Sequence, residues 1–180
     1  KEAITWFVDK GLSLEAKDTV GRTTLMYAAD CNTVDVISSL FEKGIDLEVK
    51  DNDGRTALMY AAGNNTKEAV EWILEKGLSL ESKDNEDRSL LVYAAGNPNP
   101  EVIDYLMNAG LSLEEETKEN LSRILLIAVK KNPNAGFVRK LIKIGADIEA
   151  KDEKGATPLM LAAQFNPSAE MMSVLLDLGA

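Results

Sequence analysis

The chain has 180 residues, of which 45% are hydrophobic and 28% are charged, a balance typical of a soluble, folded protein. Its net charge of −10 disfavours nucleic acid and anionic membranes as partners, and no apolar run is long enough to span a bilayer. The absence of histidine excludes Ser-His-Asp and Cys-His catalytic sites, and the single cysteine, Cys31, excludes an internal disulfide.

The first residues, 1–10, already predict a helix. Their sequence "KEAITWFVDK" has apolar side chains at helical spacing, at Ala3, Ile4, Phe7 and Val8, and nearly repeats "KEAVEWILEK" further on. The chain therefore begins halfway through a repeated unit. Because it starts with Lys1 rather than Met and has no signal-peptide pattern, we expect a processed chain or a piece of a longer one. A cytoplasmic location is favoured, and secretion stays open.

Glycines then recur at intervals of 33 to 35 residues, at Gly11, Gly44, Gly77, Gly110, Gly145 and Gly179. Each follows a segment whose apolar residues lie on one helix face, as Val70, Ile73 and Leu74 do. Glycine just beyond a helix adopts the left-handed conformation without steric strain, so each segment is predicted to be a helix that ends at its glycine. A period of this length indicates a stacked array.

An extended arm such as "IDLEVKD" and a turn such as "DNDGRT" follow these glycines and lead to another helix, which is the first helix of each unit. The glycine-ended helix is then the second. The Asp and Gly of the turn have the placing that a type I turn favours. A hydroxyl that can cap the first helix stands at Thr23, Thr56, Ser89 and Thr157. The first helices carry paired alanines, such as Ala61 and Ala62, which allow neighbouring helices to approach closely.

These segments resemble the ankyrin repeat. "DEKGATPLMLAA" is similar to the turn-plus-helix signature of that family, and "IGADIEAKD" is similar to its finger. The resemblance implies an all-α, ankyrin-type solenoid of stacked helix-turn-helix units with short β-hairpin-like fingers. We predict a single array over residues 1–180, with a half-unit and five units at 1–10, 11–43, 44–76, 77–109, 110–144 and 145–180.

The chain departs from the family pattern in three ways. The usual helix histidine is replaced by Met26, Met59, Val92, Leu126 and Met160. The hydrogen bond that the family's histidine makes to the capping hydroxyl is therefore lost, and apolar packing must replace that bond. Asparagine-rich loops such as "GNNTKE" stand where the family has a Gly-His pair, a pattern closer to bacterial arrays. The fourth unit lacks the Asp and Gly of its turn, which indicates a relaxed constraint or a local kink.

Ankyrin arrays usually bind proteins on the concave face, which the finger tips and the first helix of each unit form. The resemblance therefore implies a non-catalytic protein–protein interaction module, a scaffold that needs no cofactor. Candidate contacts with a protein partner are Arg22, Tyr27, Asn52, Asp53, Arg55, Tyr60, Asn85, Glu86, Arg88 and Tyr93. Tyr and Arg are enriched at binding hot spots, but the regular repetition of the tyrosines slightly favours packing between units. Binding and packing both stay open.

Two further surfaces are candidates for partner contact. Trp72 and Tyr105 occupy equivalent positions on glycine-ended helices, either lying over their neighbours or forming a hydrophobic contact on the back. The fourth unit is the only positively charged one of the five, and its Lys130, Lys131 and Arg139 are a candidate site for an acidic partner.

The alternative to a binding module is an architectural spacer, a segment of a longer repeat protein without a dedicated partner. Paired carboxylates occur by chance in an acidic chain, and none lies among a nucleophile, an oxyanion donor and a pocket that the sequence identifies, so an enzyme is not expected. A calcium site at "DNDG" is not expected either, because the downstream glutamate of a calcium loop is missing. The end helices present Ile4, Phe7, Leu175 and Leu176, which predicts exposed apolar edges and weak end-to-end self-association.

Overall fold

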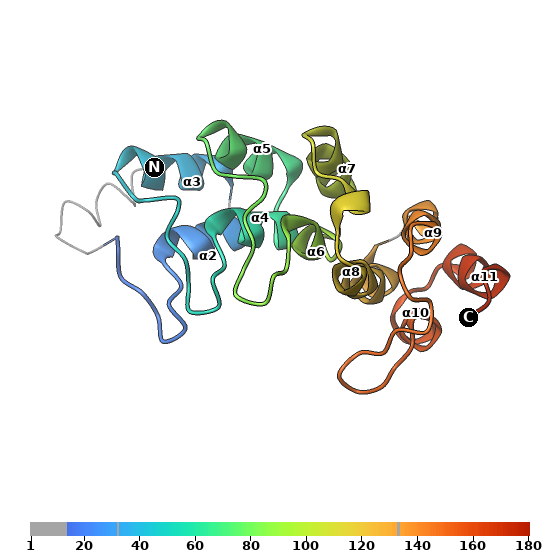
Figure 1. Ribbon diagram of the computed structural model, residues 1–180. Helices are drawn as coiled ribbons and strands as arrows, with labels where there is room; N and C mark the ends of the chain where they lie inside the picture. Colours follow the sequence, from blue (N-terminus) through green and yellow to red (C-terminus); the bar gives the residue numbers. More distant parts are fainter. Residues whose placement is uncertain (1–13, 32, 133) are drawn as a thin grey trace. The chain divides into compact units, whose positions relative to one another are not determined.

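The computed structural model describes residues 14–31, 33–132 and 134–180, which form ten α-helices and one 3₁₀ helix and contain no β-strand (Figure 1). The fold is the all-α, ankyrin-type solenoid of stacked helix-turn-helix units that the sequence predicts. Residue contacts divide the chain into a first part that ends at Leu90 and a second part, Leu91 to Ala180, and each is described by itself. The helix predicted at 1–10, with Ile4 and Phe7, lies outside the described residues.

The helices follow one another in pairs. The first part contains α2 (Thr24–Cys31) with α3 (Val34–Glu42), and α4 (Ala57–Asn64) with α5 (Lys67–Glu75). Helix α6 (Leu90–Ala94) crosses the boundary between the parts. The second part continues with α7 (Glu101–Asn108), the 3₁₀ helix η1 (Leu113–Glu115), α8 (Lys118–Lys131), α9 (Ala135–Lys143), α10 (Pro158–Phe165) and α11 (Ala169–Asp177).

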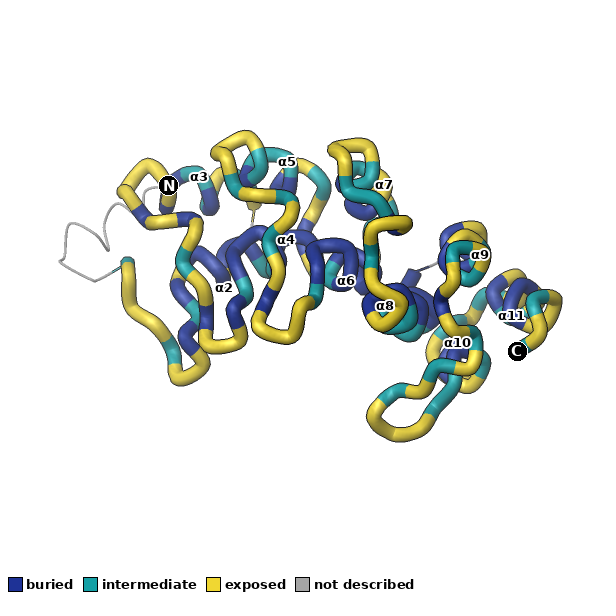
Figure 2. Tube along the Cα trace, viewed as in Figure 1, coloured by how far each residue is buried: buried dark blue, intermediate teal, exposed yellow. Residues whose placement is uncertain are grey.

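Small residues allow close packing in the first part. Ala61 and Ala62 on α4 are fully buried, and α4 makes its largest helix contact with α2 of the preceding unit (Figure 2). Met59, which stands in place of the family's histidine, is also fully buried, so apolar packing does replace the lost polar contact there. Burying one such side chain contributes about 1.5–3 kcal/mol, and stacking therefore supplies much of the stability of each unit.

Five of the six predicted glycine stops are confirmed, and the sixth, Gly11, lies outside the described residues. Gly44, Gly77, Gly110, Gly145 and Gly179 each have a positive φ, between 86° and 120°, directly after the second helix of a unit. Because residues with a Cβ rarely adopt this conformation, the recurring glycines follow from the way each helix ends.

The predicted hydroxyl caps are confirmed at only two of the four positions. Thr157 Oγ1 accepts a hydrogen bond from the Met160 amide, and Thr23 Oγ1 accepts one from the Met26 amide. The prediction is wrong for Thr56 and Ser89, whose hydroxyls are buried without a hydrogen-bond partner. At α4 the reason is that the Met59 amide donates to the carbonyl oxygen of Thr56, at 3.1 Å, instead of to its hydroxyl.

The asparagine-rich loops join neighbouring units. Asn65 Nδ2 donates to the carbonyl oxygen of Ala29 at 2.9 Å, and Asn64 Nδ2 donates to Asp30 Oδ1 at 2.7 Å. In the second part Asn166 Nδ2 donates to the carbonyl oxygen of Val129 at 3.1 Å. The last carbonyl oxygens of a helix have no hydrogen-bond donor within that helix. Asn65 and Asn166 donate to such carbonyl oxygens, at the end of the first helix of the preceding unit.

The fourth unit has no finger of the usual kind. Its arm forms η1, and α8 begins at Lys118, capped by Thr117 Oγ1, which accepts from the Asn120 amide at 3.1 Å. With 14 residues, α8 is longer than α4 and α10, which have eight each. The missing Asp and Gly of the turn therefore produce a longer helix.

An apolar face lies open on the last unit. Met160 is 60% exposed and Ala163 is exposed, whereas Met59 and Ala62, at the same positions of an inner unit, are fully buried. Phe165 and Leu176 are also more than half exposed, as expected for an apolar edge. The expectation is wrong for Leu175, which is fully buried on α11, a helix that packs against both α9 and α10.

We predict that this face mediates weak self-association. Replacing Met160→Gln together with Phe165→Asn removes apolar surface without touching the core, so the association constant should fall about tenfold. Light scattering over a concentration series measures the association constant. The control is Val20→Gln, at an exposed apolar residue on the finger tip of the first unit, and it should leave the association constant unchanged. A wild type that stays monomeric at high concentration contradicts this prediction.

Candidate functional site

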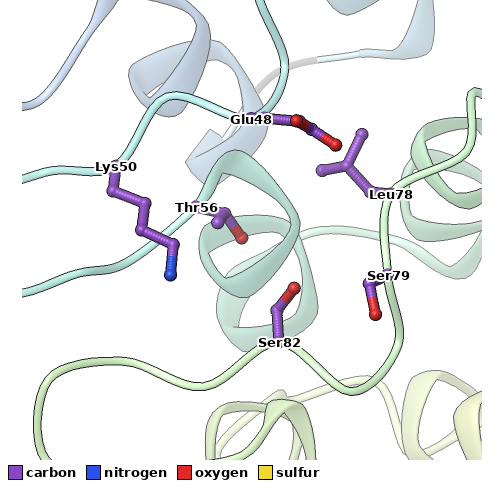
Figure 3. Close-up of a pocket in the computed structure, with 6 residues that line it drawn as sticks. All are labelled: Glu48, Lys50, Thr56, Leu78, Ser79 and Ser82. Carbon is purple, nitrogen blue, oxygen red and sulfur yellow. The ribbon is translucent and has the colours of Figure 1, made fainter.

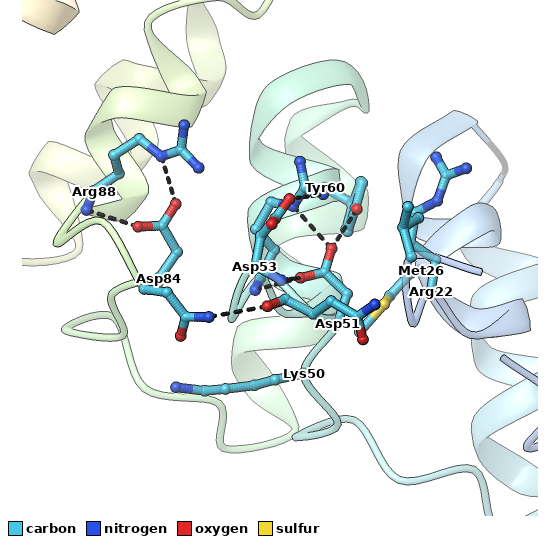
Figure 4. Close-up of polar contacts among 12 residues, drawn as sticks. Arg22, Met26, Lys50, Asp51, Asp53, Tyr60, Asp84 and Arg88 are labelled. Carbon is cyan, nitrogen blue, oxygen red and sulfur yellow. Dashed lines mark hydrogen bonds and ion pairs between the residues drawn. The ribbon is translucent and has the colours of Figure 1, made fainter. Parts of the chain in front are cut away.

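One carboxylate holds the finger of the second unit together (Figure 4). Asp51 Oδ1 accepts hydrogen bonds from the amides of Asp53 and Arg55, at 3.0 and 2.8 Å. Asp51 Oδ2 accepts from Arg55 Nε at 2.8 Å and from the Tyr60 hydroxyl at 2.7 Å. With four donors around it, this carboxylate is fully buried and fully hydrogen-bonded.

The same arrangement recurs one unit earlier. Asp18 accepts from the amides of Val20 and Arg22, from Arg22 Nε at 2.9 Å and from the Tyr27 hydroxyl at 2.8 Å. We call the sets Asp18, Arg22, Tyr27 and Asp51, Arg55, Tyr60 the Asp-Arg-Tyr clusters. Asp84 likewise accepts from the amide and Nε of Arg88. The finger conformation is thus tied to the first helix by the side chains of its own unit.

The arginine of each cluster also lies over the tyrosine ring. Arg22 Cζ is 4.5 Å from the centre of the Tyr27 ring, and Arg55 Cζ is 5.3 Å from the centre of the Tyr60 ring. A guanidinium at this distance is attracted by the ring face. Each tyrosine therefore has a structural role, in which its hydroxyl binds the finger of its own unit.

Asp18 and Asp51, which accept the hydrogen bonds of these clusters, are not among the candidate residues predicted from the sequence. A signal for them is present in the sequence, because each aspartate precedes an arginine by four residues and a tyrosine by nine in both units. Read together, these spacings indicate one hydrogen-bonded cluster, whereas the arginine and tyrosine read alone suggest a free recognition surface.

Asn52 and Asn85 connect successive fingers. Asn52 Nδ2 donates to the carbonyl oxygen of Thr19 at 3.3 Å, and Asn85 Nδ2 donates to that of Asn52 at 3.0 Å. The backbone amides of Asn52 and Asn85 also donate to the preceding finger, to the carbonyl oxygens of Val20 and Asp53. A Cβ at Gly54 would collide with Asn85, so the turn glycine is needed both for its φ of 81° and for this contact.

Some of the candidate residues still present surface to solvent. Tyr27 is 46% exposed and Val20 at the finger tip is 42% exposed, and Asp53 and Glu86 are exposed acidic side chains. Asp53 and Glu86 form ion pairs with Arg55 and Arg88. Tyr60 is half-buried. The tips of the first part are therefore accessible, and they carry both acidic and basic side chains.

The remaining candidates lie in several places. Tyr93 on α6 and Tyr105 on α7 are half-buried in the second part. Lys130 Nζ is 3.5 Å from Asp152 Oδ2, so Lys130 supplies a positive charge to the finger of the last unit, which has Ala156 in place of arginine. Lys131 is exposed at the end of α8, and Arg139 is half-buried on α9.

Trp72 belongs to an aromatic cluster on the outer helices of the first part. Its ring meets the Phe41 ring edge to face, with ring centres 5.6 Å apart. Lys76 Nζ lies 5.0 Å from the centre of the Trp72 ring and 5.9 Å from that of Phe41. Trp72 thus lies over its neighbour, as one of the two interpretations of the sequence expects.

The clusters shift the pKa values of their members. Burial acts to raise the pKa of Asp18, but hydrogen bonds from Tyr27 and Arg22 outweigh it and lower the pKa from 3.8 to about 2. Burial also opposes the hydrogen bonds at Asp51, whose pKa is lowered in the same way. Burial and the hydrogen bond to Asp51 raise the pKa of Tyr60. Both carboxylates are therefore ionised, and the Tyr60 hydroxyl stays protonated, at neutral pH.

Among the described residues, no three or more acidic or cysteine side chains gather in a group that could hold a metal ion. No helix within the described ranges combines the length and apolarity needed to cross a membrane. The site offers hydrogen-bonded fingers and accessible side chains, which is chemistry suited to binding.

Stacked helix pairs with projecting, hydrogen-bonded fingers define a repeat scaffold. The family model for ankyrin repeats matches residues 1–84 and 46–117, and the chain belongs to this family. No match was found among curated proteins. Among solved structures, a similar chain is the immunity protein in a complex with a predatory endopeptidase from Bdellovibrio bacteriovorus. It is 26% identical, with a TM-score of 0.63, and the match covers 98% of this chain and 91% of that one.

We predict that Tyr60→Phe destabilises the protein although the ring is kept. It removes the hydroxyl that donates to the buried Asp51 carboxylate, which should lower the free energy of unfolding by about 1 kcal/mol after solvent screening. Urea denaturation measures the loss. Tyr27→Phe, at the more exposed cluster, should have a smaller effect, and equal effects would contradict the role of burial.

We also predict that the clusters make the stability depend on acid pH. A lowered pKa in the folded state stabilises the protein above the unfolded value of 3.8, and this contribution is lost as the pH falls toward about 2. The urea midpoint of the wild type should therefore fall steeply between these pH values. The double variant Asp18→Asn with Asp51→Asn should be less stable at neutral pH and should show a flatter profile. A profile as steep as that of the wild type would contradict this.

Proposed function

We propose that this chain is a non-catalytic binding module that holds a protein partner on the surface formed by its finger tips and first helices. Members of the ankyrin repeat family generally mediate protein–protein interactions. The solved chain that is similar to this one over nearly its whole length is likewise in a complex with another protein.

The observation that carries this proposal is the hydrogen bonding within the fingers. The Asp-Arg-Tyr clusters and the bonds from Asn52 and Asn85 hold the tips in one conformation before any partner arrives. A surface that is already ordered loses little conformational entropy on binding, so more of the contact energy appears as affinity. Tyr27 and Val20 remain accessible on this surface and supply apolar area.

The charge of the whole chain indicates the chemistry of the partner. The net charge is −10, whereas Asp53 and Glu86 at the tips are paired with Arg55 and Arg88. We expect a partner with a basic or neutral contact surface, since like charges across an interface oppose binding. Lys131 and Arg139 stay a second candidate surface, for an acidic partner.

A more specific form of the proposal concerns the nature of the partner. The similar solved chain is an immunity protein in complex with an endopeptidase. By analogy, we propose that the partner of this chain is an enzyme whose activity is blocked in the complex. A rigid row of fingers suits this role, because it can cover an active-site entrance without supplying any catalytic group.

The alternative is the architectural spacer, which has no dedicated partner. The two functions differ in the surface that mutation affects. A binding module loses its partner when the finger tips are changed, whereas a spacer is insensitive to the charge of its tips.

The test is an affinity comparison between two charge-matched double variants. Asp53→Lys with Glu86→Lys reverses two charges at the finger tips. Glu42→Lys with Glu75→Lys reverses two exposed charges at the ends of α3 and α5. A partner captured by the wild type from its native extract is identified by mass spectrometry and then purified. We expect the tip variant to bind it at least about tenfold more weakly, a change of about 1.4 kcal/mol, and the control variant to bind it almost normally.

Two results would overturn the proposal. If both variants bind the purified partner as the wild type does, the finger tips are not the contact surface. If the control loses affinity and the tip variant does not, the binding surface lies on the outer helices around Trp72. Assay of the purified partner with one equivalent of this chain then tests whether an enzyme activity is blocked.

A further inference from the structure

A pocket of about 240 Å³ lies between the arms of the second and third units (Figure 3). Glu48 and Lys50 line it from one arm, and Leu78, Ser79 and Ser82 line it from the next. Thr56, directly before α4, forms its inner wall. All of these residues belong to the first part of the chain. None of them is among the finger-tip residues proposed above to bind the partner.

Thr56 carries an unsatisfied polar atom into this pocket. The residue is only 4% exposed, and its Oγ1 has no hydrogen-bond partner. At the equivalent position of the first unit, Thr23 Oγ1 accepts a bond from the Met26 amide and caps the helix. A buried hydroxyl without a partner is unfavourable by about 1–3 kcal/mol, so its retention at Thr56 calls for a group that it can bind.

The groups around Thr56 favour a negative charge. Lys50 is exposed, and among the described residues its ammonium has no ion-pair or hydrogen-bond partner. Figure 3 places the Lys50 side chain and the hydroxyls of Thr56 and Ser82 around the same space. The first turn of α4 adds amides without partners inside the helix and the positive end of the helix dipole.

The opposite edge of the pocket has a different chemistry. Glu48 lies there beside Leu78, away from the Thr56 and Ser82 hydroxyls (Figure 3). A carboxylate at this edge repels a second negative charge, which disfavours phosphate, and accepts a hydrogen bond from a donor. Leu78 offers a small apolar contact. The pocket is therefore matched to a small group with a negative end, a donor next to it and an apolar branch.

We propose that this pocket binds an α-carboxylate that has a nitrogen donor on the neighbouring carbon. Lys50, Thr56 and Ser82 hold the carboxylate, Glu48 accepts the N–H group, and Leu78 contacts the side chain. Two sources share this chemistry: the carboxyl-terminal residue of a polypeptide, and a free amino acid. The proposal does not depend on the protein-binding function of the finger tips.

The test uses four small probes and amide NMR spectra of the ¹⁵N-labelled full chain. N-acetyl-Ala-Ala with a free carboxylate represents a peptide terminus, and L-alanine represents a free amino acid. N-acetyl-Ala-Ala-amide lacks the carboxylate, and acetate lacks the nitrogen donor. Each probe is titrated into the millimolar range at constant ionic strength. We expect the first probe, the second or both to shift the amides of Thr56, Ser79 and Ser82 saturably, and the amide and acetate to bind at least tenfold more weakly.

Three variants separate binding from folding. Thr56→Val keeps the shape of the side chain and removes the unsatisfied hydroxyl, so it should leave the urea midpoint unchanged or raise it while weakening the probe at least tenfold. The matched change Thr23→Val removes a cap, so it should lower the urea midpoint and leave probe binding intact. Lys50→Met should weaken the probe without affecting stability.

The outcomes are decisive in either direction. Saturable shifts by a carboxylate probe that Thr56→Val and Lys50→Met both weaken support the site, and the better of the first two probes identifies the source. The proposal is overturned if no probe shifts these amides, if the peptide amide or acetate binds as well as the carboxylate peptide, or if Thr56→Val binds normally. A Thr56→Val protein that is less stable than the wild type would indicate a purely structural hydroxyl, and would also overturn it.

Discussion

The arrangement of the fingers depends on a buried carboxylate that cannot be left unsatisfied. An ionised aspartate removed from water needs donors on every side, and Asp51 obtains them from two amides, a guanidinium and a phenol of its own unit. Those donors come from the finger and from the first helix, so satisfying the charge fixes one against the other. Because the requirement is local, it can be repeated in each unit, and the glycine turns and alanine pairs then allow the units to stack.

The parts of the fold that could be predicted are those set by local chemistry. The helix ends at Gly44 and Gly77 follow from a positive φ, and the burial of Ala61 and Ala62 follows from the need for close packing. The absence of a hydroxyl cap at Thr56 could not be predicted, because its hydroxyl and its carbonyl oxygen can each accept the Met59 amide and the sequence does not distinguish between them. The length of α8 could not be predicted either. The sequence shows that the Asp and Gly of the turn are missing, but it does not show that a longer helix takes their place.

For the candidate residues, the structure adds the hydrogen bonds that the sequence could not show. Tyr60 was identified from its recurrence, with packing and binding left open, and its hydroxyl turns out to bind Asp51 within the same unit. Exposed area and hydrogen bonding are both needed to assign such residues. The tyrosine hydroxyls bind the aspartates of the fingers, while Tyr27, Val20, Asp53 and Glu86 remain exposed to solvent.

The most direct test compares hydrogen exchange at two fingers of the same molecule. The Arg55 amide donates to Asp51 in a finger that has the full Asp-Arg-Tyr cluster, and the Ala156 amide donates to Asp152 in a finger that has Ala156 and Leu161 in place of arginine and tyrosine. If the cluster orders the finger, the Arg55 amide exchanges at least about tenfold more slowly than the Ala156 amide, after correction for intrinsic rates. Equal exchange at the two amides would contradict the account.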